Sequence, residues 1–207
     1  MKKIVDELDL LIEHNTWLEH FMNVQIENGW IDFEREISKI VQEFEEVLKI
    51  NNDIFKEDKG ENSWNQLLTL RQNNMFRRLG IELSENIEKD VKEKKEKRLK
   101  DLNRLIRCLE IYLSYYIINV GAEKTLPDID QLPSIDKVLS FNYTNTFERL
   151  YGNRFPAEID YIHGKADISK NIHTNNMVLG IDEYLKGEER NENIEFIAFK
   201  KFYQRIH

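Results

Sequence analysis

The chain has 207 residues, which is the length of one large domain or two small ones at roughly 100–200 residues per domain. Its 41% hydrophobic and 33% charged residues are typical of a soluble globular protein, and a formal net charge of -8 argues against binding to bare nucleic acid. A single cysteine, no signal peptide and no apolar stretch near the roughly 20 residues of a membrane helix predict a cytoplasmic protein without a membrane segment.

The character of the chain changes near residue 126. All three prolines lie beyond that point: Pro127, Pro133 and Pro156. Apolar residues recur at helical spacing before it, and short apolar runs bounded by turn-forming residues follow it. We therefore predict a helical subdomain over residues 1–126 and a partial α/β core over residues 127–207. The fold class is a mixed α+β or α/β fold that is mainly helical.

Four helices are expected in the first part. Their ranges are 4–24, 30–48, 64–79 and about 85–116, with a loop rich in Asn, Asp and Gly over residues 51–62. The last of them begins with alternating Lys and Glu, which must be solvated, and continues as an apolar stripe. Tyr112, Tyr115 and Tyr116 lie on that stripe, which indicates a core or interface position.

Three short apolar runs in the second part predict buried strands. Their ranges are 138–141, 159–162 and 177–181, and a short helix is expected over residues 145–151. Strand, helix, strand is the alternation of a parallel sheet, and both faces of such a sheet need covering. Three strands are few for this architecture, so we expect the core to be partial.

The candidate site lies after the first two predicted strands. Residues 141–146 follow the first strand, and residues 162–164 follow the second. In open α/β sheets, ligands bind beyond the carboxyl ends of the strands, so both segments are expected at the same edge. Their polar side chains predict a site for chemistry on a ribose.

Each polar residue of these segments suits a role in such a site. The amide of Asn142 can hold a ribose hydroxyl or a water, and Thr144 or Asn145 can cap the following helix, whose free N–H groups would bind a phosphate. His163, followed by Gly164, has the side chain whose unperturbed pKa suits proton transfer near neutrality. The plainer interpretation is that the first segment is a helix cap and the His-Gly pair a turn.

Three further patterns leave alternatives open. Asp182, after the third predicted strand, can bind a ribose diol or cap the next helix. His163 and His173, with Asp167 between them, match no compact metal spacing, so no metal is expected. Residues 199–206 favour an amphipathic helix over a basic contact to phosphate or RNA.

Five motifs occur in a fixed order along the chain. They are WIDFEREI (30–37), FNYTNTFE (141–148), IHG (162–164), VLGIDE (178–183) and FKKFYQRI (199–206). Together they resemble the AbiH family, proteins associated with abortive infection of bacteria by phages. The resemblance runs from about Trp17 to the last residue, and it implies a bacterial role in antiviral defence with a phage or host protein as trigger.

The chain departs from that family at both ends. The family opens with a strand and a Gly-Asn-Gly-Phe-Asp type loop and closes with a Gly-His-Ser type motif, and this chain has neither. It therefore resembles an internal piece. The missing glycine loop is the segment expected to cradle phosphates at a helix start.

A strand-end Asn with a later His-Gly is also similar to the sirtuin-like NAD-consuming domains. This similarity implies a Rossmann-type core with NAD or another nucleotide as substrate. It gives Asn142 the role of ordering the nicotinamide ribose or a water, and His163 the role of a base on the ribose hydroxyls. Such domains commonly have Asp where this chain has Thr144, so a carboxylate expected near the ribose is absent.

Two functions from different classes follow. The first is an abortive-infection enzyme that, in its intact form, hydrolyses the glycosidic bond of NAD or another nucleotide. The alternative is a non-catalytic module whose long helices form a homo-oligomer or bind a partner protein, or an inactive truncated fragment. Thr144 and the missing glycine loop favour the alternative.

Overall fold

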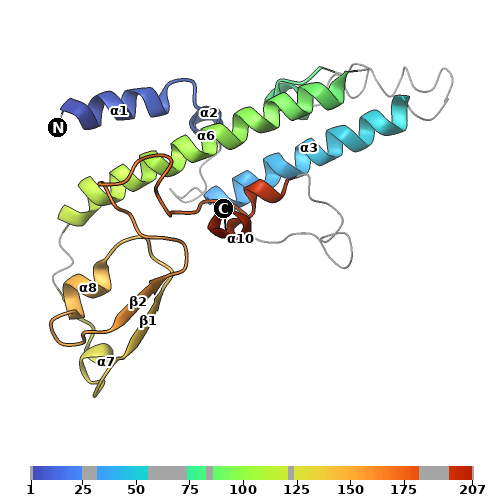
Figure 1. The fold of residues 1–207 in the computed structure, drawn as a ribbon. Helices are drawn as coiled ribbons and strands as arrows, with labels where there is room; N and C mark the ends of the chain where they lie inside the picture. Colours follow the sequence, from blue (N-terminus) through green and yellow to red (C-terminus); the bar gives the residue numbers. More distant parts are fainter. Residues whose placement is uncertain are drawn as a thin grey trace. The chain divides into compact units, whose positions relative to one another are not determined.

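The computed structural model describes residues 2–24, 32–55, 74–82, 86–120, 124–181 and 196–206. These residues are mainly helical and contain one small parallel sheet, as predicted (Figure 1). The elements are α1 (Lys2–Ile12), α2 (Thr16–Asn23), α3 (Phe33–Phe55), α5 (Asn74–Leu79), α6 (Ile87–Tyr115), η1 (Ile117–Asn119), α7 (Pro127–Asp130), β1 (Lys137–Ser140), α8 (Thr146–Tyr151), β2 (Glu158–Tyr161), η2 (Ile197–Phe199) and α10 (Lys201–Ile206). None of these helices is long and apolar enough to cross a membrane.

Contacts between residues divide the chain into two compact units. The sheet unit comprises Met1–Met22, Leu102–Leu179 and Lys201–His207, and the helical unit comprises Asn23–Asp101 and Gly180–Lys200. Helix α6 gives its first part to the helical unit and its last part to the sheet unit. The domain boundary near residue 126 stays a prediction; β1 begins beyond it, at Lys137.

The first predicted helix is two helices in the structure, so that prediction is wrong. They meet at His14, which takes a positive φ of 50°. The Asn15 side chain is fully buried and accepts hydrogen bonds from the N–H groups of Trp17 at 3.0 Å and Leu18 at 3.3 Å, so it caps α2. The spacing of apolar residues does not reveal this break, because the break depends on the side-chain oxygen of a single polar residue.

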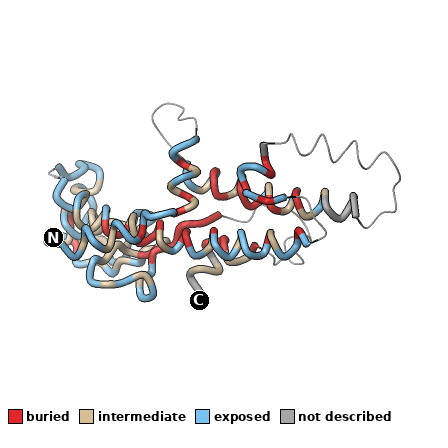
Figure 2. The backbone as a smooth tube through the Cα atoms, turned by 90° about the horizontal axis from the view of Figure 1, so that it is seen from above, coloured by how far each residue is buried: buried red, intermediate tan, exposed pale blue. Residues whose placement is uncertain are grey.

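Helix α3 carries the apolar stripe that the sequence predicts. The Asp32 carboxylate accepts a hydrogen bond from the N–H of Arg35 at 3.0 Å and caps the helix. Its buried apolar residues recur at helical spacing along one side (Figure 2): Ile37, Ile40, Val41, Phe44 and Val47. The helix continues to Phe55, so the loop predicted from residue 51 begins too early. Asn and Asp cost a helix no more than about 0.7 kcal/mol per residue, so their presence alone does not end a helix.

Helix α6 joins the charged stretch and the second apolar stripe into one helix of 29 residues. In its first part Ile87 and Val91 are buried, while most of the lysines and glutamates are exposed. The side-chain amide of Asn119 donates a hydrogen bond to the carbonyl of Tyr115 at 2.6 Å, where the helix ends and η1 begins. Of the helix predicted over residues 64–79, the described part is α5.

Strands β1 and β2 are parallel and are connected through α8, as the strand-helix-strand pattern predicts. Leu139 lies opposite Asp160 and Ser140 opposite Tyr161. Residues alternate between exposed and half-buried along both strands. This register places the carboxyl ends of both strands at one edge of the sheet.

The third predicted strand does not join this sheet. Residues 177–180 have no strand pairing, and Ile181 makes only an isolated parallel bridge to Lys200. The apolar side chains of residues 177–179 are buried, but a buried apolar run can satisfy its backbone through turns and side chains instead of a ladder. The described residues form a two-stranded sheet, so a sirtuin-like Rossmann core stays a hypothesis.

Candidate functional site

The carboxyl edge of the sheet brings the two predicted segments together. The N–H of Ala166 donates a hydrogen bond to the carbonyl of Tyr143 at 2.8 Å. The rings of Phe141 and His163 lie edge to face with centroids 6.0 Å apart. The loop after β1 is therefore adjacent to the loop after β2, which is the arrangement expected of parallel strands.

His163 is held by aromatic neighbours and through its backbone. Besides Phe141, the ring of Tyr143 lies 6.2 Å from the imidazole. The His163 carbonyl accepts a hydrogen bond from the N–H of Val178 at 3.0 Å, and the Tyr143 hydroxyl donates to the Val178 carbonyl at 2.8 Å. These contacts fix a half-buried imidazole at the sheet edge.

Asn142 is exposed in the turn after β1. Its N–H donates a hydrogen bond to the Ser140 hydroxyl at 3.3 Å, and that hydroxyl donates to the Asn142 carbonyl at 3.2 Å. Among the described residues, none bonds to the side-chain amide of Asn142. The amide is therefore available to a ligand.

Gly164 occupies a position that only glycine can fill. Its φ is +82°, and a Cβ on this residue would lie 1.9 Å from the carbonyl oxygen of Asn176. Its N–H donates to the carbonyl of Tyr161 at 3.0 Å, which closes a turn after β2. The plainer interpretation of the His-Gly pair as a turn therefore describes its backbone.

Asn145 is the N-cap residue of α8, but its side chain makes no capping hydrogen bond. The prediction of the cap position is right, and that of an Asn145 side-chain cap is wrong. The hydroxyls of Thr144 and Thr146 bond to each other at 2.9 Å instead. Helix α8 has six residues and carries Glu148 in its first turn, which weakens its attraction for an anion.

Two cavities in the sheet unit are lined by three of the predicted residues. The first, which we name the η1 cavity, has a volume of about 360 Å³ and includes Thr144 and Asn145. The second has a volume of about 740 Å³ and includes Gly164. Neither of these two cavities is lined by Asn142 or His163. Asp182 lies outside the described residues.

Lys165 and Asp167 line both cavities. Lys165 forms an ion pair with Glu148 at 2.8 Å and lies over the Tyr161 ring, 5.3 Å from its centroid. Burial, followed by the charge of Glu148, raises the pKa of Tyr161 to about 12. Hydrogen bonds from the hydroxyl and the N–H of Ser169 lower the pKa of Asp167.

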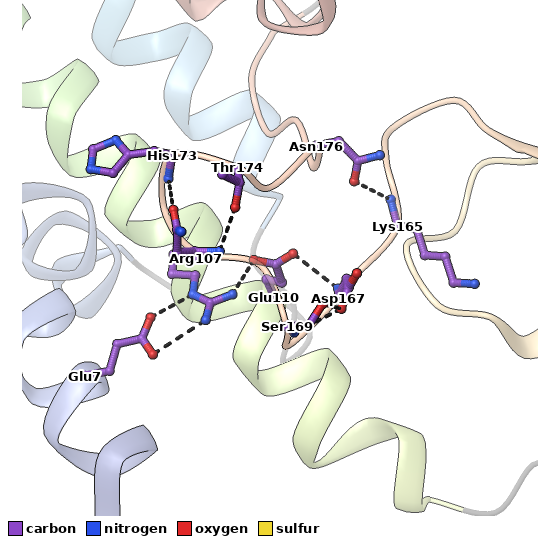
Figure 3. Close-up of polar contacts among 10 residues, drawn as sticks. Glu7, Arg107, Glu110, Lys165, Asp167, Ser169, His173, Thr174 and Asn176 are labelled. Atoms are coloured by element: carbon purple, nitrogen blue, oxygen red, sulfur yellow. Dashed lines mark hydrogen bonds and ion pairs between the residues drawn. The ribbon is translucent and has the colours of Figure 1, made fainter.

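A buried ion-pair network, which the sequence patterns did not predict, supports the loop after β2 (Figure 3). Arg107 and Glu110 of α6, with side chains 4% and 0% exposed, bond at 2.7 Å. Arg107 also bonds Glu7 of α1 at 2.8 Å, and Glu110 accepts the N–H of Asp167 at 3.2 Å. Burial lowers the pKa of Arg107, but Glu7 and Glu110 outweigh it and raise the pKa overall. The sequence pattern that could have indicated this network is the pair of charged residues, Arg107 and Glu110, within the apolar part of α6.

The structure also places the tyrosines at the end of α6 and the basic residues near the C-terminus. Tyr112 and Tyr116 are 51% and 50% exposed, so a core position for these two is wrong and an interface position stays a prediction. Residues 201–206 form the expected helix α10, and Lys200 and Lys201 are buried, which argues against an exposed basic contact there. Within the described ranges, no group of three His, Cys, Asp or Glu residues is placed to hold a metal ion.

The comparisons with known proteins identify the family. The family model described as bacteriophage abortive infection AbiH matches residues 7–206. No curated protein and no solved structure matches the chain. Because the family match covers nearly the whole sequence, including both loops at the sheet edge, the chain belongs to the bacteriophage abortive infection AbiH family.

Proposed function

We propose that this protein acts in phage defence by binding a nucleotide at the carboxyl edge of its sheet and hydrolysing the glycosidic bond, with NAD as the leading candidate. Membership of the AbiH family implies the defence role. The enzymatic part is supported by one observation, the adjacency of the loops after β1 and β2. The hydrogen bond between Ala166 and Tyr143 joins these loops at 2.8 Å.

In this proposal the residues at the sheet edge divide the chemistry. The free amide of Asn142 holds the ribose or the hydrolytic water, and His163 acts as general base. Water attacks the anomeric carbon of the ribose as the bond to the leaving base breaks, and His163 accepts the proton from a ribose hydroxyl or from the water. The position of the imidazole beside two aromatic rings suits this role, because proton transfer needs a defined geometry.

The remaining residues of the site bind the substrate. Thr144 and Asn145 hold a phosphate of the nucleotide where the η1 cavity meets α8. Gly164 lets the chain turn tightly enough to present His163. Asp182 binds the ribose diol in this proposal. Thr144 supplies a hydroxyl where a sirtuin-like domain commonly has a carboxylate, so the ribose depends more strongly on Asn142.

The experiment follows NAD consumption by the purified chain, with the released base separated by chromatography. We expect His163→Ala to lower the rate at least about 100-fold, the loss typical of a general base. Asn142→Ala is expected to slow it as well. The matched control is His173→Ala, because His173 is an exposed loop histidine to which the proposal gives no role. Equal rates for His163→Ala and the unchanged chain would remove His163 from the mechanism.

A second candidate function is a non-catalytic interaction module. The rings of Tyr112, on α6, and Tyr116, just after it, stack with centroids 6.0 Å apart, and both are half exposed. Stacked, exposed aromatic side chains are enriched where proteins meet their partners. Light scattering tests this candidate: an oligomer that Tyr112→Ser together with Tyr116→Ser dissociates would support it. A monomer that hydrolyses a nucleotide would argue against it.

A further inference from the structure

We propose that the η1 cavity binds a phosphate monoester whose organic part is apolar. The volume of about 360 Å³ falls within the roughly 300–1,000 Å³ of small-molecule sites. Its lining combines two chemistries, because the end of α6 and η1 give apolar side chains, whereas α8 and the residues before it give a cation and hydroxyls. A ligand with one apolar end and one anionic end matches both.

The apolar side comes from the end of α6 and from η1. It is formed by Leu113, Ile117, Ile118 and Val120, of which Ile118 is 39% and Val120 64% exposed. An organic group seated here would remove apolar surface from water, which stabilises the complex.

The cation that α8 contributes to the lining is Arg149. Its guanidinium is exposed and bonds to no other residue that the structure describes. The neighbouring Lys165, by contrast, is paired with Glu148 at 2.8 Å. An arginine fork matches two phosphate oxygens with parallel hydrogen bonds. Arg149 therefore supplies the charge that attracts an anion to this cavity.

The hydroxyls of the cavity favour phosphate over carboxylate. Thr144 and Thr146 bond to each other at 2.9 Å, which uses one O–H and leaves the other free to donate. With the N–H donors of the Arg149 guanidinium, the cavity offers more donors than the two oxygens of a carboxylate need, whereas a phosphate monoester has three terminal oxygens. The one carboxylate in the lining, Asp167, already accepts the hydroxyl of Ser169 at 2.6 Å and its N–H at 2.9 Å.

This inference deepens the proposed function where Thr144 and Asn145 hold a phosphate, and to that extent it rests on it. Neither Asn142 nor His163 lines the cavity. The two proposals are tested by different measurements, because the η1 cavity is tested by ligand binding and the proposed enzyme by NAD consumption. If the chain binds phenyl phosphate but does not consume NAD, only the proposed enzymatic activity is refuted. If it consumes NAD but does not bind phenyl phosphate, only this inference is refuted.

The experiment is isothermal titration calorimetry of the chain with phenyl phosphate, and with inorganic phosphate and phenol as its two halves. We expect phenyl phosphate to bind at least about tenfold more tightly than either half. Arg149→Gln should raise its Kd about tenfold or more, as expected on losing hydrogen bonds to a charged group. Ile118→Asp should raise it as well, because it places a negative charge on the apolar side.

The matched control is Arg77→Gln, which removes an exposed arginine from α5, outside the cavity lining. Its Kd should stay within about twofold of the unchanged chain, and circular dichroism shows whether each variant is folded. Three results overturn the proposal: no binding of phenyl phosphate at millimolar concentration, equal Kd values for Arg149→Gln and the unchanged chain, or inorganic phosphate that binds as tightly as phenyl phosphate.

Discussion

Removing the Glu110 carboxylate should destabilise the sheet unit strongly, because it leaves Arg107 charged and buried. The two side chains are 0% and 4% exposed and bond at 2.7 Å. Breaking a buried ion pair by deleting one partner typically costs about 3–5 kcal/mol. Arg107 keeps its bond to Glu7 at 2.8 Å, and Glu7 is 38% exposed, so we expect Glu110→Ala to lower the free energy of unfolding by about 3 kcal/mol.

The assay is urea unfolding followed by circular dichroism. Glu96→Ala is the matched control, because Glu96 is an exposed glutamate of the same helix and its loss should change stability by no more than about 0.5 kcal/mol. The double change Arg107→Leu with Glu110→Leu removes both charges and should stay within about 2 kcal/mol of the unchanged chain.

A local measurement separates this network from a general effect on helix stability. Glu110 accepts the N–H of Asp167 at 3.2 Å, so Glu110→Ala should speed hydrogen exchange at that amide. The reasoning is refuted if Glu110→Ala costs less than about 1 kcal/mol, or if the double change is as destabilising as the single one.

Three further predictions concern separate positions. Gly164→Ala should cost about 3 kcal/mol or more in urea unfolding, because φ is +82° and the new Cβ would lie 1.9 Å from a carbonyl oxygen; a loss below about 1 kcal/mol would contradict this. Asn15→Ala should cost about 1–2 kcal/mol through the lost cap of α2, and an unchanged melting temperature would argue against the cap. Burial raises the pKa of Cys108 from 9.0 to about 11, so iodoacetamide should react slowly at pH 8 and faster toward pH 11. Because the folded-state pKa is the higher one, this thiol stabilises the fold below about pH 9, and that contribution is lost as pH rises to about 11; rapid alkylation at pH 8 would refute the assignment.

Local patterns were sufficient wherever one element meets a continuous apolar surface. The stripe from Ile37 to Val47 predicted the buried side of α3. The alternation of strand, helix and strand predicted the parallel pair β1 and β2. From the parallel pairing it followed that the loops after the strands share an edge. In each case the periodicity of apolar residues specifies which side of an element is buried.

The sequence by itself therefore determined the mainly helical fold, the parallel strand pair and the edge where the candidate site lies. The tertiary structure alone decided that Thr144 and Asn145 share a cavity that His163 does not line. It also decided that Arg107 bonds Glu7, 100 positions away, and that Glu110 bonds Asp167, 57 positions away. Apolar spacing records which side of one element is buried, whereas a polar partner comes from a distant segment whose position depends on how the whole unit packs.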